Sequence, residues 1–312
     1  HLLEPAWSSP QVHRESGVLL VEDDGQVILR LAFPAAEILS IRSADGRHQF
    51  DPRGDVRLDE TRHRLTFIET GPVPRIAESS RFVPRDAPMS YRHRVDDPET
   101  NLLYAPGRWF HDRNVEVTYR RADLPDDAKA EAAASAASVA GQVRADDDRD
   151  AFDLPQTLQL LRDGSPLRIG ISGDSISTGL DASYKVGAEP NQPGYVELIA
   201  AQLQQSSGSP ITTINRSVAG WSVAHGLEDL ETLLATEPNL LIVAYGMNDV
   251  GRRDPTWFLD RNAELIARAR ELNPQIEILL VAPMLGNDDW IHTPRAMFGE
   301  YRDQLRSLTG PG

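Results

Sequence analysis

Apolar residues alternate with polar residues over the first 122 positions and gather into longer apolar runs after residue 153. The alternation predicts short strands, because one face of a half-buried strand recurs every two residues. Two Asp-Gly pairs, at 24–25 and 45–46, mark turns between them. The expected strands are 17–22, 27–32, 37–42, 64–69 and 115–120. Strands at this spacing predict a β-sandwich of jelly-roll type.

Residues 123–152 differ in composition from both neighbouring stretches. The run 128–140 is rich in alanine without a consistent apolar stripe, and 146–150 is an acidic cluster. Such a segment is typical of a linker or a loosely held surface segment. We therefore divide the chain into a sandwich domain over 1–122, an Ala/Asp-rich linker over 123–152 and a second domain over 153–312.

The second domain alternates apolar strands with helices. The expected strands are 167–172, 211–216, 240–245 and 276–283, and the expected helices are 195–205, 223–235, 255–272 and 294–308. A short helix to Arg162 precedes them, with Asp153 as its N-cap and Pro155 in its first turn. Apolar strands between amphipathic helices predict an α/β fold, with a parallel sheet covered on both faces. In such sheets functional groups collect at the carboxyl ends of the strands.

Composition narrows the classes of function. The net charge of −15 argues against a nucleic-acid partner, since phosphates are repelled. The absence of cysteine excludes disulfides and thiolate sites. No apolar run reaches the length of a membrane span, no ligand spacing indicates a metal, and no cofactor is implied. The chain starts at His1 rather than Met, so a signal peptide could have preceded it, and we expect a secreted or periplasmic protein.

Three successive strand ends carry polar residues beside glycines. The first ends in Gly173-Asp174-Ser175, the second leads through Asn215 to Gly220, and the third ends in Gly246-Met247-Asn248-Asp249. Taken singly, a helix cap, a tight turn and a turn-forming Asn would explain them. Their occurrence at the same sheet edge favours a site instead, and a helix starting just beyond Ser175 would supply free N–H groups for an anion.

These three blocks resemble blocks I, II and III of the SGNH (GDSL-type) hydrolases in order and spacing, over about residues 165–312. The resemblance implies a flavodoxin-like three-layer fold. It implies that Ser175 attacks an ester carbonyl, and that the N–H groups of Ser175 and Gly220 and the amide of Asn248 bind the oxyanion.

A sandwich preceding such a domain is similar to the two-domain bacterial carbohydrate esterases, acetyl-xylan esterases among them. We therefore expect a carboxylic ester hydrolase acting on an acylated small molecule or carbohydrate. Two alternatives stay open: a carbohydrate-binding protein that keeps the fold without turnover, and an enzyme of lipase or thioesterase type. The sequence does not determine the oligomeric state.

Members of this family carry the general base in an Asp-x-x-His pair that follows a fifth strand. The chain ends at Gly312 after a helix, so we expect it to be truncated before that strand. One Asp-x-x-His, Asp289 to His292, follows the fourth strand and is the alternative base pair, although it comes one strand early. His225 is a weaker candidate. We interpret the stretch 109–113 (Trp-Phe-His-Asp-Arg) as a packed strand end rather than a surface motif.

Overall fold

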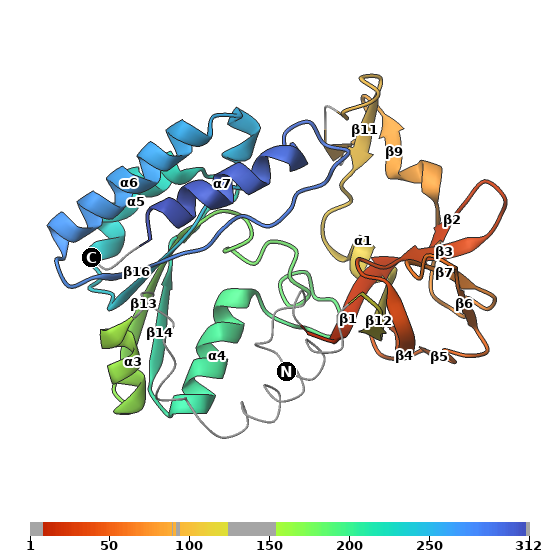
Figure 1. Cartoon of the computed structure of the whole chain (residues 1–312), viewed down its shortest axis with the longest axis horizontal. Coiled ribbons are helices and arrows are strands. Elements are labelled where there is room, and N and C mark those ends of the chain that lie inside the picture. The colour runs from red at the N-terminus through yellow and green to blue at the C-terminus, as the bar shows by residue number, and fades with distance from the viewer. Residues whose placement is uncertain (1–8, 89, 92–93, 124–153, 310–312) are drawn as a thin grey trace. The chain divides into compact units, whose positions relative to one another are not determined.

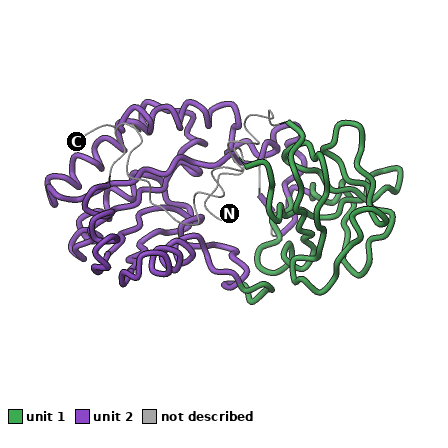
Figure 2. Tube along the Cα trace, turned by 60° about the horizontal axis from the view of Figure 1, so that its bottom comes forward, with its two compact units in different colours: residues 1–83, 103–148, 186–191 green, residues 84–102, 149–185, 192–312 purple. Residues whose placement is uncertain are grey.

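The computed structural model describes residues 9–88, 90, 91, 94–123 and 154–309 (Figure 1). Chain contacts divide it into two compact units, each built from separate segments (Figure 2). Unit 1 comprises residues 1–83, 103–148 and 186–191, and unit 2 comprises 84–102, 149–185 and 192–312. The expected linker over 123–152 lies, apart from Asp123, outside the described residues.

Unit 1 contains two sheets, of order β1-β12-β4-β5 and β6-β7-β3-β2-β8. All neighbours in the sheets pair antiparallel except β2 and β8, which are parallel. The strands are β1 (Gln11–Val18), β2 (Leu20–Val21), β3 (Val27–Arg30), β4 (Ala35–Ser43), β5 (Gln49–Phe50), β6 (Val56–Leu58), β7 (Arg64–Phe67), β8 (Ile76–Ala77) and β12 (Asn114–Arg121). One core takes side chains from both sheets, Ile41 and Val117 from the first and Leu29 and Leu65 from the second. The predicted sandwich is confirmed and fits the jelly-roll type.

Several short elements connect these strands to the rest of the chain. They are η1 (Glu78–Arg81), β9 (Phe82–Pro84), β10 (Ser90–Tyr91), β11 (Thr100–Leu103) and α1 (Arg108–His111). Strands β10, β11 and β9 form a small third sheet in that order. Helix α1 covers the stretch 108–111, so the interpretation of 109–113 as a strand end is wrong, although Trp109 and Phe110 are half-buried and pack edge to face.

Unit 2 holds a parallel sheet of order β14-β13-β15-β16. Its elements are α3 (Pro155–Arg162), β13 (Leu167–Gly173), α4 (Tyr195–Ser207), β14 (Ile211–Asn215), α5 (Val223–Leu234), β15 (Leu240–Ala244), η2 (Val250–Arg252), α6 (Pro255–Leu272), β16 (Glu277–Leu280) and α7 (Arg295–Ser307). Helix α3 has Leu154 as its N-cap, so the expected cap at Asp153, which is itself not described, is wrong by one residue.

Alternate residues of the central strand β15 point into two different cores. Leu241 and Val243 pack with α5, α6 and α7, whereas Leu240 and Ile242 pack with α3 and α4. Figure 1 shows these two groups of helices on opposite faces of the sheet. A strand buried on both faces needs a continuous apolar run, which is what β15 has. The predicted three-layer parallel fold is confirmed. No helix within the described residues has both the length and the apolar character to cross a membrane.

Candidate active site

Strand register brings the three polar blocks to one edge of the sheet. Ile171 of β13 pairs with Asn215 of β14, and Gly173 of β13 pairs with Ala244 of β15. All three strands run in the same direction, so their following loops leave the sheet together. The Val218 N–H, three residues past β14, donates to the Gly173 carbonyl at 3.2 Å. Blocks I, II and III are therefore neighbours, as their sequence order implied.

Block I is a series of turns that starts at Asp174. The Asp174 carboxylate is buried, and its Oδ1 accepts the Ile176 N–H at 2.9 Å. The Ser175 carbonyl accepts the Leu180 N–H at 3.0 Å and the Thr178 hydroxyl at 2.7 Å. Ser175 itself is half-buried. The expected helix just beyond Ser175 is absent, since turns continue and the next described helix begins at Tyr195.

The amide of Ser175 is nevertheless available. Among the described residues, no acceptor is hydrogen-bonded to the Ser175 N–H, and no donor or acceptor lies at hydrogen-bond distance from its Oγ. The turns therefore expose the N–H group that the sequence had assigned to a helix terminus. Gly173 allows the tight packing here, because a Cβ on it would lie 2.4 Å from the Ser177 hydroxyl.

Block II presents a second free amide. The Trp221 N–H donates to the Val218 carbonyl at 3.1 Å, which closes a four-residue turn with Gly220 at its third position and a φ of +84°. That conformation is the one a type II turn requires, and it favours glycine. In such a turn the third residue's own N–H makes no turn hydrogen bond. Gly220 is exposed, and its N–H has no acceptor in the described part of the chain.

Block III is fastened to block II through Asn248. Its side-chain Nδ2 donates to the Trp221 carbonyl at 2.8 Å, which uses one of the two amide hydrogens. The side chain is exposed, so the second hydrogen is left for another acceptor. The backbone two residues before Asn248 requires a glycine, because the φ of Gly246 is +132° and a Cβ there would lie 2.7 Å from the Pro283 ring.

Asp249 is a buried carboxylate that the sequence analysis passed over as part of a turn. It is 1% exposed, and its Oδ1 accepts the Val223 N–H at 3.0 Å at the start of α5. Its Oδ2 is buried with no hydrogen-bond partner in the described residues. Burial raises the pKa of Asp249 to about 6, opposed by the hydrogen bond from Val223, and the nearby Asp174 carboxylate adds to the rise. Burial also raises the pKa of Asp174.

His225 lies close to block II but is held as a helix cap. Its Nδ1 is 3.1 Å from the Ser222 backbone nitrogen and 3.0 Å from the Ser222 hydroxyl, and its ring stacks on Trp221. A backbone N–H can only donate, so Nδ1 is an acceptor and the ring proton of neutral His225 resides on Nε2. In this tautomer Nε2 cannot accept a proton from a serine.

Asp289 and His292 lie in the irregular segment after β16. The Asp289 carbonyl accepts the Val95 N–H at 3.0 Å, and the His292 ring packs edge to face on Trp290 at 5.3 Å. The His292 carbonyl lies against Gly251 of η2, where a Cβ would be 2.9 Å away. No hydrogen bond joins Ser175 to either histidine side chain within the described residues. Those residues also hold no group of three or more acidic or histidine side chains arranged to bind a metal.

Comparison with known proteins places these blocks in a family. Residues 171–310 match the model of the GDSL-like Lipase/Acylhydrolase family. No curated protein matches the chain.

Similar solved structures include TesA, at 27% identity over 45% of this chain and 71% of that one, with a TM-score of 0.35. The acetylxylan esterase Axe2 from Geobacillus stearothermophilus is 22% identical over 46% and 72%, also with a TM-score of 0.35. A two-domain esterase active on acetylated mannans is 21% identical over 41% and 33%, with a TM-score of 0.34. The match to the family model spans all three blocks, and the C-terminal part of this chain, residues 171–310, is a GDSL-like (SGNH) lipase/acylhydrolase domain.

Proposed function

We propose that the protein is a serine esterase that works through an acyl-enzyme and removes acetyl groups from carbohydrate. The observation that carries the reaction is a pair of N–H groups, on Ser175 and Gly220, that have no acceptor among the described residues and lie at the sheet edge that also bears the Asn248 amide. A tetrahedral oxyanion is stabilised by hydrogen-bond donors that converge on it, and these three groups are the proposed donors. The chain also contains a sandwich unit, as do the two-domain carbohydrate esterases that its sequence resembles, and a polymeric carbohydrate is therefore the proposed alcohol part of the ester.

In the first half-reaction the Ser175 Oγ attacks the ester carbonyl carbon while its proton passes to a general base. The carbonyl oxygen becomes an anion held by the two N–H groups and by the second hydrogen of Asn248. The C–O bond to the sugar then breaks, and the proton returns from the base to the sugar oxygen. Water repeats these steps on the acetyl-enzyme, which releases acetate and restores the serine.

The general base that activates Ser175 has two candidates. One is the Asp289–His292 pair, and the other is an Asp-x-x-His pair of the kind expected after a further strand. The tautomer of His225 argues against this histidine as a third candidate for the general base. The hydrogen bond from Val95 to the Asp289 carbonyl and the close approach of the His292 carbonyl to Gly251 favour a structural role for the segment 289–292.

The proposal is tested by hydrolysis of p-nitrophenyl esters with acyl chains from acetyl to decanoyl, and of acetylated xylan and mannan, by the protein and its Ser175→Ala variant. We expect the highest kcat/KM for acetyl esters and a loss of at least about 10³-fold in kcat on Ser175→Ala. Hydrolysis that is unaffected by Ser175→Ala would refute the acyl-enzyme. A preference for decanoyl esters would instead indicate an enzyme of lipase or thioesterase type.

A second candidate function is carbohydrate binding without turnover. It is favoured by one observation, the absence of a hydrogen-bonded base at Ser175 within the described residues. It predicts no release of acetate from any of these esters, together with saturable binding of the same polysaccharides to both the protein and Ser175→Ala.

A further inference from the structure

Unit 1 contains a cavity, lined by both polar and apolar groups, that the proposed reaction does not use. Its volume is about 490 Å³, within the range of roughly 300–1,000 Å³ typical of small-molecule pockets. Its walls come from the loop after β4, the segment 72–74, helix α1 and the segment 187–191, all of which belong to unit 1. Helix α1 overlaps the Trp-Phe-His-Asp-Arg stretch, 109–113, that the sequence analysis singled out.

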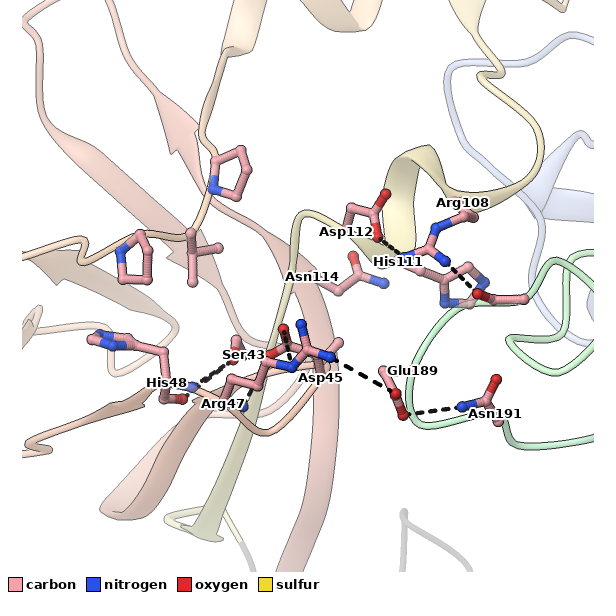
Figure 3. Close-up of a pocket in the computed structure, with 15 residues that line it drawn as sticks. Ser43, Asp45, Arg47, His48, Arg108, His111, Asp112, Asn114, Glu189 and Asn191 are labelled. Atoms are coloured by element: carbon pink, nitrogen blue, oxygen red, sulfur yellow. Dashed lines mark hydrogen bonds and ion pairs between the residues drawn. The ribbon is translucent and has the colours of Figure 1, made fainter.

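The charged side chains of the cavity are paired with one another (Figure 3). Arg108 donates to Asp112 at 3.0 Å and to the Gly187 carbonyl. Arg47 lies between Asp45, at 3.8 Å, and Glu189, at 4.0 Å. Asn191 in turn donates to Glu189 at 3.0 Å. The two guanidinium groups thus face three carboxylates, which leaves no excess of positive charge for a phosphate or a carboxylate ligand.

The same groups keep hydrogen-bonding capacity for a neutral ligand. The two ion pairs of Arg47 are longer than hydrogen bonds, so its N–H groups can still donate, and Asn191 retains an amide hydrogen and its carbonyl oxygen. Hydrogen bonds from Ser43 and from the Arg47 backbone lower the pKa of Asp45, which keeps it an ionised acceptor at neutral pH. Donors and acceptors interleaved in this way match neighbouring hydroxyl groups, each of which donates and accepts.

An apolar wall completes the cavity. Pro72, Val73 and Pro74 form it, and Val73 is buried in the sandwich core while the prolines are exposed. A pyranose ring has one face of C–H groups and an edge of hydroxyl groups, so it can lie against the prolines while its hydroxyls reach the paired charges. We infer that this cavity binds a neutral oligosaccharide.

The inference is tested by isothermal titration of the full chain carrying Ser175→Ala, so that the result is independent of hydrolysis. The probes are xylohexaose, mannohexaose and cellohexaose, with hexagalacturonate as the acidic comparison. Arg47→Ala and Asn191→Ala alter two exposed side chains of the cavity and should leave the fold intact. Arg57→Ala, at an exposed arginine of β6 outside the cavity, is the matched control.

We expect saturable binding of at least one neutral hexasaccharide. Each cavity variant should weaken it about tenfold, the effect of losing hydrogen bonds to a charged or amide group, and Arg57→Ala should not. Absence of binding by all three neutral probes would overturn the inference, as would binding that both cavity variants leave unchanged or binding of hexagalacturonate alone. If the wild-type protein hydrolysed none of the esters, the proposed reaction would be refuted, whereas this binding site would not.

Discussion

The Asp249 carboxylate is buried, and only one of its two oxygens has a hydrogen-bond donor among the described residues. Its ionised form therefore destabilises the folded protein. Its folded-state pKa of about 6 lies above the ordinary value of 3.8, which means that the folded protein binds this proton more tightly than the unfolded chain does. Stability should therefore fall as pH rises from about 4 to about 6 and level off above, by roughly 2–3 kcal/mol from this group.

Asp249→Asn tests this linkage, because it keeps an oxygen for the Val223 N–H and removes the ionisation. Urea unfolding at pH 4.5, 5.5 and 7.5 should give a flatter free-energy profile for Asp249→Asn than for the wild-type protein. Some slope should remain, because the pKa of Asp174 is raised in the same direction. Superimposable profiles would show that Asp249 does not titrate in this range.

Asn248 tests the oxyanion donors separately from the nucleophile. Asn248→Ala should lower kcat about 10²–10³-fold with little change in KM, since the bond to the anion exists only in the transition state. Asn248→Asp, similar in shape but negatively charged, should lose at least as much. Kinetics on p-nitrophenyl acetate measure both, and a rise in KM at constant kcat would assign Asn248 to ground-state binding instead.

His292 distinguishes the two sources of the base. Because its segment is held by contacts to Val95 and Gly251, His292→Ala should lower kcat less than about tenfold, far less than Ser175→Ala. A loss comparable with that of Ser175→Ala would instead make the Asp289–His292 pair the catalytic base.

At the scale of elements, helix α5 contacts the residue that follows strand β15, Tyr245, through a glycine. A Cβ on Gly226 would lie 2.5 Å from the ring of Tyr245, whose hydroxyl is hydrogen-bonded to the Ser172 hydroxyl at 2.9 Å in the core. Gly226→Ala should therefore destabilise the protein by about 1–3 kcal/mol, although alanine favours helices.

Gly299 in helix α7 provides the matched control, because a Cβ there would meet nothing within 4 Å. Gly299→Ala should raise stability by up to about 1 kcal/mol. Thermal unfolding of both variants measures the contrast, and equal shifts in Tm would mean that α5 moves away from β15 without cost.

Elements were predictable from the sequence where their burial follows a regular period. Helix α6 has the predicted bounds, 255–272, because Asp254 caps it and Pro255 starts it. Strand β1 was predicted only from residue 17, since much of its sequence is polar and it is held by pairing with β12 along its length. The role of Asp249 could not be predicted, because its burial depends on the packing of α5 beside β15.

For the whole molecule, the fold class could be predicted from the sequence, but the assignment of each segment to one of the two units could not. Residues 84–102 belong to unit 2, where Tyr91 stacks on Trp290 at 4.6 Å and Val95 donates to Asp289. These contacts join positions almost 200 residues apart, and no local pattern encodes them.

A fragment comparison tests the contribution of this segment. The fragment 84–312 retains the contacts of residues 84–102 to the segment around Trp290, whereas 153–312 loses them. We expect the longer fragment to melt at a higher temperature. Equal Tm values would show that residues 84–102 add nothing to unit 2.

The segments of the two units alternate along the sequence, and this order has a consequence for how the gene can recombine. The chain passes between the units after residues 83, 102, 148, 185 and 191. A single recombination breakpoint in the gene therefore cannot transfer either unit whole, and a breakpoint between 186 and 191 would divide both units, since it separates residues 84–102 and 149–185 of unit 2 from residues 192–312. Related genes should accordingly carry the two parts as one block and diverge together, rather than exchange the sandwich as a separate cassette.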